Sequence, residues 1–150
     1  MSLTKKYEGY SSFSYLEAGK DYKSFDLADE LTRVPPYTLP LSEEDETRVR
    51  SLIDASLLVS MHEHVGVFPD KIQETPEYAR HGRMHTAFKG LAASHWDCVF
   101  DNLMDGICHI HSSSGWQWDD VLHDLGMRLC DLAHQDFVLQ IGRASCRERV

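Results

Sequence analysis

The sequence has no long hydrophobic run, and this absence argues against a membrane-spanning helix and does not support secretion by a standard signal. No stretch of the 150 residues approaches the roughly 18 to 20 uninterrupted apolar residues that a membrane-spanning helix requires. Lys5 and Lys6 near the start are not followed by the apolar stretch of a secretion signal. We therefore expect a cytoplasmic protein with no membrane span.

Basic residues are also scarce, at 15 Lys and Arg against 24 Asp and Glu, which gives a formal net charge of −9. Proteins that bind nucleic acid or anionic membrane surfaces need an excess of cations facing the phosphates. We therefore expect no nucleic acid among the partners. Hydrophobic residues make up 42% of the chain, which argues against disorder, and its length suffices for one domain with a core.

The cysteines are few and form no recognisable motif. Cys98, Cys108, Cys130 and Cys146 are irregularly spaced, and no Cys-x-x-Cys pair is present. In a chain without an export signal this pattern indicates reduced, mostly buried thiols. A thiol-based redox module would need a reactive cysteine of low pKa. The sequence also lacks a glycine-rich phosphate loop and a Gly-x-Ser-x-Gly elbow, so no common nucleophile or phosphate motif assigns a function.

The last ten residues, 141–150, differ in charge from the rest of the chain. Removing their charge of +2 from the total of −9 leaves −11 for residues 1–140. One frame of a common sequencing-adaptor oligonucleotide, ATCGGAAGAGCGTCGTGTAGGGAAAGAGTG, translates to these residues, and the two bases before that frame complete the codon of Gln140. We therefore expect a non-native tail at 141–150 and a natural protein that continues differently; the alternative is a genuine basic tail.

Residues 1–41 are predicted to form an N-terminal extension on the surface. They show no sustained hydrophobic period, and three prolines between positions 35 and 40 disfavour helix in the residues before them. At Ser42 the pattern changes to a helix-capping residue followed by acidic residues, which predicts a helix over 43–55. The apolar residues at helical spacing there are Val49, Leu52 and Ile53.

The remaining pattern alternates short apolar runs with helical periods, which predicts an α/β fold with a parallel sheet. Residues 57–61 are predicted to be a buried strand, although a continued helix stays open. The other expected elements are a loop at 71–83, a helix at 86–95, a strand at 98–104 closed by Asp105 and Gly106, a hairpin or loop at 107–114, a helix at 118–135 and a strand at 137–139. The apolar face of the last helix is expected to consist of Trp118, Val121, Leu122, Leu125, Leu129 and Leu132.

His62 and His64 are the candidate metal ligands. Residues two apart on a strand point to the same side, so the two imidazoles project together while Glu63 faces the other way. They follow a buried strand, at the end where α/β barrels build their sites, and neutral imidazoles suit zinc. A zinc site usually needs at least three protein ligands, so the alternative of two solvent-facing histidines stays open.

Two other histidine pairs are weaker candidates. His109 and His111 form a second His-x-His beside Cys108, but they lead into a serine-rich turn without zinc-finger spacing. His81 and His85 are four apart, but the glutamate of a metalloprotease helix is missing between them. Neither pair is therefore expected to bind metal.

Four segments together resemble the amino-terminal part of the membrane dipeptidase family, also called renal-dipeptidase-like. They are LVSMHEH at 58–64, FDNLMDG at 100–106, GWQWDDV at 115–121 and DLGMRL at 124–129. The resemblance implies that residues 42–140 are the first βα units of an incomplete (β/α)8 barrel related to the amidohydrolases. It implies zinc-dependent hydrolysis of dipeptides by two ions that share a bridging hydroxide, and it places His62 and His64 at the metal positions of the first strand.

The sequence departs from the pattern of that family in two ways. The first-strand pattern is His-x-Asp, whereas His64 stands here in place of the aspartate, so the number and identity of the metal ions stay open. The bridging glutamate and two later histidine ligands of the family would lie beyond residue 140. We therefore expect no catalytic residue and no significant activity in this chain, and by analogy a possible homodimer of the complete protein. The rival is a non-catalytic small α/β protein that packs against or binds a partner.

Overall fold

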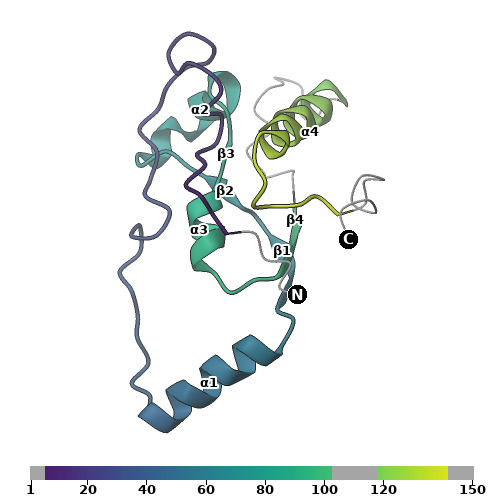
Figure 1. Cartoon of the computed structure of the whole chain (residues 1–150). Coiled ribbons are helices and arrows are strands. Elements are labelled where there is room, and N and C mark those ends of the chain that lie inside the picture. The colour runs from purple at the N-terminus through teal and green to yellow at the C-terminus, as the bar shows by residue number, and fades with distance from the viewer. Residues whose placement is uncertain (1–5, 103–117, 142–150) are drawn as a thin grey trace.

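The computed structural model describes residues 6–102 and 118–141, which form a mixed α/β structure (Figure 1). The helices in these ranges are α1 (Glu43–Ala55), α2 (Thr75–His81), α3 (Phe88–Ala93), α4 (Trp118–Ala133) and the 3-10 helix η1 (Ile72–Glu74). The strands are β1 (Val59–Glu63), β2 (Gly66–Val67), β3 (His85–Thr86) and β4 (Cys98–Asp101). The described residues form two two-stranded sheets and no closed barrel. None of their helices is long and apolar enough to cross a membrane.

Strands β1 and β4 pair in parallel as predicted, whereas β2 and β3 pair antiparallel, so the expected parallel sheet is confirmed only in part. The paired residues are Val59 with Cys98, Ser60 with Val99 and Glu63 with Asp101. The ladder is irregular between Ser60 and Glu63. The prediction that β1 is buried is wrong, because only Ser60 is buried and Met61 is 71% exposed. A continuously apolar strand is typical of sheets that are covered by other layers on both faces. Among the described elements only β4 contacts β1 extensively, so most of β1 stays exposed.

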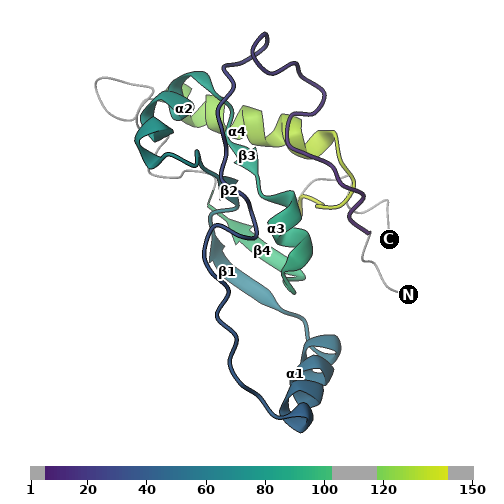
Figure 2. The same cartoon turned by 90° about the vertical axis from the view of Figure 1, so that its left-hand side faces the viewer.

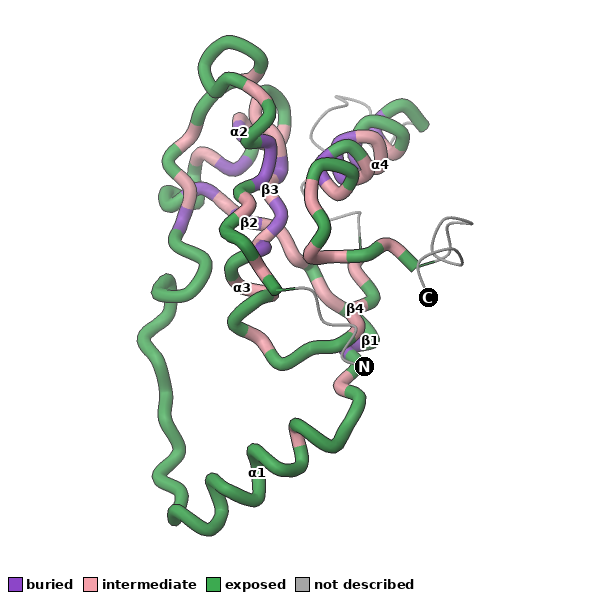
Figure 3. Tube along the Cα trace, viewed as in Figure 1, coloured by how far each residue is buried: buried purple, intermediate pink, exposed green. Residues whose placement is uncertain are grey.

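Helix α1 has the predicted bounds and capping residue. The Ser42 hydroxyl oxygen accepts the backbone N–H of Asp45 at 3.1 Å, and four acidic residues follow in the first turn. The helix lies apart from the other elements (Figures 1 and 2) and buries none of its residues (Figure 3). Its formation is therefore explained by local signals, since Val49 and Leu52 on its apolar side are exposed.

Helix α2 and η1 occupy the segment 71–83, where the prediction of a loop is wrong. Pro76 lies in the first turn of α2, where a missing backbone N–H breaks no helical hydrogen bond. The helix buries Tyr78, whose hydroxyl oxygen accepts the backbone N–H of His85 at 2.8 Å. Gly82 is needed directly after α2, because a Cβ there would lie 2.5 Å from the Tyr78 ring.

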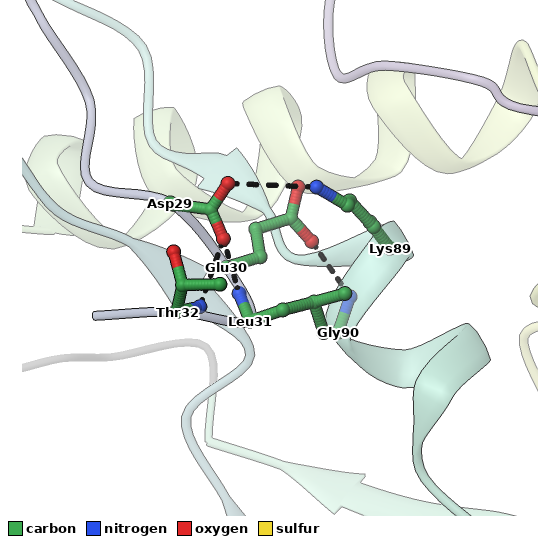
Figure 4. A network of polar contacts seen from close by, with 6 residues as sticks. All are labelled: Asp29, Glu30, Leu31, Thr32, Lys89 and Gly90. Carbon is green, nitrogen blue, oxygen red and sulfur yellow. Dashed lines mark hydrogen bonds and ion pairs between the residues drawn. The ribbon is translucent and has the colours of Figure 1, made fainter. Parts of the chain in front are cut away.

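Helix α3 lies within the predicted range of 86–95 but is shorter. The residue before it, Ala87, has no side chain that could cap the helix. Glu30, which is distant in sequence, provides the missing acceptor: its carboxylate accepts the backbone N–H of Gly90 at 2.8 Å (Figure 4). A negative charge at this end of a helix also interacts favourably with the helix dipole.

Asp29 holds the turn that presents Glu30. Its carboxylate accepts the backbone N–H groups of Leu31 and Thr32 at 2.8 and 2.9 Å and pairs with Lys89 at 3.5 Å (Figure 4). These hydrogen bonds, aided by the Lys89 ammonium, hold the pKa of Asp29 at about 2. The N-terminal segment is thereby attached to α3 at the point where it leaves toward α1.

Helix α4 is confirmed, but the prediction of its buried face is largely wrong. The buried residues are Asp120, Asp124, Met127, Arg128 and Asp131. Trp118 and Leu122 of the expected apolar face are exposed, Trp118 by 71%. The spacing of the apolar residues predicted the helix correctly. Which side of it is buried depends on the segments packed against it, and the spacing does not reveal these.

The prediction of a third strand at 137–139 is also wrong. The amide of Gln135 accepts the backbone N–H of Val138 at 2.7 Å and donates to the backbone oxygen of Val138 at 2.9 Å. Both groups that a neighbouring strand would pair with are therefore taken by one side chain, and the chain turns.

The N-terminal segment enters the core and does not simply lie on the surface. Phe13 is only 1% exposed, and its φ of 56° lies in the left-handed region, which is costly for a residue with a Cβ. The fully buried carboxylate of Asp131 accepts three hydrogen bonds from this segment. The donors are the Tyr10 hydroxyl at 2.8 Å, the Ser12 hydroxyl at 2.6 Å and the Phe13 backbone N–H at 2.9 Å.

Strand β3 joins the same set of hydrogen bonds. The backbone N–H of Thr86 donates to the Ser12 hydroxyl oxygen at 2.7 Å, and Arg128 donates to the Thr86 hydroxyl oxygen at 3.2 Å. We call Tyr10, Ser12, Thr86, Arg128 and Asp131 the Asp131 cluster. It connects the N-terminal segment, β3 and α4 through polar groups that are mostly buried.

His85 packs beside the Asp131 cluster, with its ring 5.4 Å from that of Phe13 in an edge-on arrangement. Burial lowers the pKa of His85, and the nearby Asp131 carboxylate acts in the opposite direction. The imidazole is therefore easier to protonate in the unfolded chain than in the folded one.

Removing the Asp131 carboxylate should destabilise the chain strongly. In Asp131→Ala three donors lose their common acceptor in the core, and each buried donor left unsatisfied costs on the order of 1 to 3 kcal/mol. We expect the free energy of unfolding, measured by urea titration, to fall by about 3 kcal/mol or more. The control Asp119→Ala removes an exposed carboxylate of α4 and should cost less than about 1 kcal/mol. Equal losses in the two variants would contradict a central role for Asp131.

Stability should decrease with acidification between about pH 7 and pH 5. Since the folded-state pKa of His85 lies below its unfolded value, the unfolded chain binds more protons in this window, and stability is lost as the pH falls. Denaturant titrations across the window should show a shallower slope of stability against pH for His85→Gln. The control His81→Gln, at an exposed histidine, should keep the original slope. An unchanged slope in His85→Gln would refute this assignment.

Candidate metal site

The end of β1 brings the two predicted ligands together. His62 lies within β1 and His64 follows one residue after it. Their Nε2 atoms are 2.9 Å apart, and the ring centroids are separated by 4.8 Å with an angle of 69° between the planes. Both side chains are exposed. The imidazoles thus converge at the surface, as the two-residue spacing predicted.

The two ring nitrogens lie slightly closer together than two ligands of one zinc ion would. Two nitrogens bound at about 2.0 to 2.1 Å to one tetrahedral ion lie about 3.3 Å apart, so the 2.9 Å separation would have to widen by about 0.4 Å for the pair to share an ion. The same 2.9 Å also suits one hydrogen bond between the rings, with the donor set by the tautomers. Among residues 6–102 and 118–141, no group of three or more His, Cys, Asp or Glu side chains could hold a metal ion. The described pair is therefore at most part of a ligand set.

Glu63, between the two histidines, is held by both its backbone and its side chain. Its backbone oxygen accepts the N–H of Asn102 at 2.8 Å, which continues the ladder beyond β4. Its carboxylate accepts the Ser60 hydroxyl at 2.5 Å. Ser60 is the buried residue of β1, so it links the irregular end of the strand to its paired part.

The backbone after His64 is fixed by further hydrogen bonds. The His64 backbone oxygen accepts the N–H of Gly66 at 2.8 Å, which starts the turn into β2. The N–H of Val65 donates to the Asp101 carboxylate at 3.2 Å, and the Val65 oxygen accepts the N–H of Ala87 at 2.9 Å. Asp101 of β4 and Ala87, which directly follows β3, thus help to hold the backbone beside His64.

The structure does not combine the weaker histidine candidates into a site. His81 is exposed at the end of α2, with its Nε2 3.9 Å from the Glu77 carboxylate, whereas His85 lies in β3 against Phe13. Cys108, His109 and His111, like the predicted hairpin at 107–114, lie outside the described residues, as do tail residues 142–150.

The cysteines in the described ranges correct one expectation. Cys98 is half-buried and Cys130 is exposed, and both are free, so the prediction of mostly buried thiols is wrong for these two. Cys108 and Cys146 lie outside the described residues.

A shallow depression of about 320 Å³ lies elsewhere, next to α2. Lys23 and Glu77 in its wall form an ion pair at 2.9 Å, and this contact lowers the pKa of Glu77. Neither His62 nor His64 lines the depression. It is therefore a separate surface feature.

Two aspartates at the ends of β4, Asp97 and Asp101, were not predicted from the sequence to have a role. Asp101 is the last residue of β4, and Asp97 directly precedes it. The Asp97 carboxylate accepts the backbone N–H of Leu58 at 2.9 Å, just before β1. The available signal for Asp101 was a carboxylate directly after the apolar run 98–100 of a predicted strand.

Comparisons of the chain with protein families, with curated proteins and with solved structures found no match. Functional inference for this chain therefore depends on its own residues and their geometry.

Proposed function

We propose that this chain supplies the first-strand half of the zinc site of a dipeptidase whose complete form is a (β/α)8 barrel. The observation that carries the proposal is the convergence of His62 and His64, with Nε2 atoms 2.9 Å apart and exposed at the carboxyl end of a strand. In α/β barrels the residues at the carboxyl ends of the parallel strands form the catalytic site.

The parallel pairing of β1 and β4 supports this placement. Because parallel strands end on the same side, the histidines after β1 and Asp101 at the end of β4 lie at one edge of the sheet. The exposed positions of β1 are those that further layers of a barrel would cover. The segments that resemble the membrane dipeptidases run through both strands and α4.

In this proposal the residues of the chain bind and orient, and they do not transfer protons to the substrate. His62 and His64 would each offer a ring nitrogen to zinc, and their backbone is held by the contacts of Glu63 and Val65. Zinc, when bound, supplies Lewis-acid activation of water and of the scissile carbonyl. An imidazole at position 64 in place of a carboxylate leaves more positive charge at the site, which favours binding of an anionic substrate group.

The proposal assigns the remaining ligands to residues outside this chain. Two imidazoles are fewer than the three protein ligands that catalytic zinc usually has, and no larger ligand group is present among residues 6–102 and 118–141. The complete dipeptidase is proposed to be a cytoplasmic enzyme, with homodimer formation resting on analogy with other barrel enzymes.

A second candidate is a non-catalytic α/β protein in which the two histidines contact each other and bind no metal. The observation that favours it is that 2.9 Å between the Nε2 atoms is an ordinary hydrogen-bond distance. The two candidates differ in whether the pair takes up metal.

Zinc uptake separates the two candidates. We expect the purified chain to bind about one zinc per molecule in equilibrium dialysis followed by metal analysis, and the double variant His62→Ala/His64→Ala to lose this ion. The matched control is His81→Ala/His95→Ala, which removes two exposed histidines elsewhere and should keep the zinc. Equal zinc content in the chain and in His62→Ala/His64→Ala would overturn the metal proposal and favour the second candidate.

An activity assay of the chain tests whether further zinc ligands, beyond His62 and His64, are needed for catalysis. The chain incubated with zinc and an L,L- or L,D-dipeptide should release no amino acid above the rate with zinc alone, measured by amine detection after separation. Turnover near the ordinary enzymatic range of about 1 to 1000 per second would show that the 150 residues hold a complete site.

A further inference from the structure

The carboxylate of Asp101 reaches the backbone directly beside a proposed zinc ligand. Its Oδ1 accepts the N–H of Val65 at 3.2 Å, across from the strand end that carries His64. Asp101 pairs in register with Glu63, the residue before His64. One residue of β4 therefore contacts the chain on both sides of this histidine.

These contacts determine how His64 is presented. The peptide group between His64 and Val65 has its N–H bound by Asp101 and its oxygen bound by Gly66 at 2.8 Å. With both polar groups of one peptide held, the rotation about the preceding Cα–C bond of His64 is restricted. The Cα–Cβ direction of His64 is then set relative to His62, which lies in the ladder.

A nearly identical contact exists at the other end of the same ladder. The Asp97 carboxylate accepts the N–H of Leu58 at 2.9 Å, before β1 begins. Each aspartate thus ties its end of β4 to the backbone flanking β1. Only Asp101 does so next to a histidine of the pair, so the two aspartates differ in position while making the same kind of bond.

We propose that Asp101 is a positioning residue for metal binding: its carboxylate holds the Val65 peptide so that the His64 imidazole converges with that of His62. The inference rests on the proposed function, since it concerns the same pair of ligands. Residues that orient metal ligands from behind typically change metal affinity by about 10- to 100-fold when they are removed. Asp101 acts here through the backbone of Val65. This role needs an oxygen atom that accepts the Val65 N–H, and it does not depend on the negative charge of the carboxylate.

The test compares three variants of the full chain: Asp101→Ala, Asp101→Asn and Asp97→Ala. Zinc affinity is measured by competition with a chromophoric chelator, and circular dichroism checks that each variant is folded. We expect Asp101→Ala to weaken zinc binding about tenfold or more. Asp101→Asn keeps an oxygen acceptor for Val65 and should stay within about threefold of the unchanged chain, as should Asp97→Ala, which removes only the distant bond.

Two outcomes would overturn the inference. If Asp101→Asn loses zinc as severely as Asp101→Ala, the charge of the carboxylate matters, and Asp101 acts as a ligand or as a counter-charge. If Asp97→Ala weakens binding as much as Asp101→Ala, the effect belongs to ladder stability in general.

A second readout separates failure of this inference from failure of the proposed function. Absence of zinc binding by the unchanged chain even in a large excess of zinc, where a partial ligand set should still be occupied, would refute the proposed function. The imidazole NMR signals of His62 and His64 in the metal-free chain test the positioning directly: they should shift or broaden in Asp101→Ala and stay unchanged in Asp97→Ala. Signals unaffected by Asp101→Ala would overturn the inference whatever the zinc result.

Discussion

The hydrogen bonds to the buried Asp131 carboxylate join the N-terminal segment to α4 and, through Ser12, to β3. A fully buried carboxylate is tolerated only when donors replace the lost water, and Tyr10, Ser12 and Phe13 supply them from the N-terminal segment. Ser12 in turn binds the backbone of Thr86 in β3, and the next residue, Ala87, donates to the oxygen of Val65. A continuous series of contacts thus runs from the core to the backbone beside His64.

Carboxylates recur in this chain as acceptors for backbone N–H groups of distant segments. Glu30 caps α3, and Asp97 and Asp101 bind the backbone at the two ends of β1. Such bonds are stronger than those between neutral groups, and they suit a chain with a formal charge of −9 and few extended ladders. The acidic composition that argues against nucleic-acid binding therefore also contributes to holding the fold together.

The sequence predicted features that depend on local periodicity, and it missed those set by distant contacts. The bounds of α1 and the convergence of His62 and His64 follow from spacing within a few residues, and the parallel pairing of β1 with β4 follows from the alternation of short apolar runs with helical periods. The loop predicted at 71–83 is helical because Pro76 begins a helix as readily as it breaks one. The buried side of α4 was missed because it is selected by Asp131 and its donors more than 100 residues away. The burial of β1 was overestimated because it depends on layers that the described residues do not provide.

The central claim is that His62 and His64 together bind one zinc ion as half of a hydrolytic site. X-ray absorption spectroscopy of the zinc-loaded chain tests it most directly. We expect two imidazole nitrogens at about 2.0 to 2.1 Å from the metal, and loss of that signature in His62→Ala/His64→Ala. Zinc bound with fewer than two imidazoles, or an identical spectrum in the double variant, would show that the two histidines do not bind the ion together.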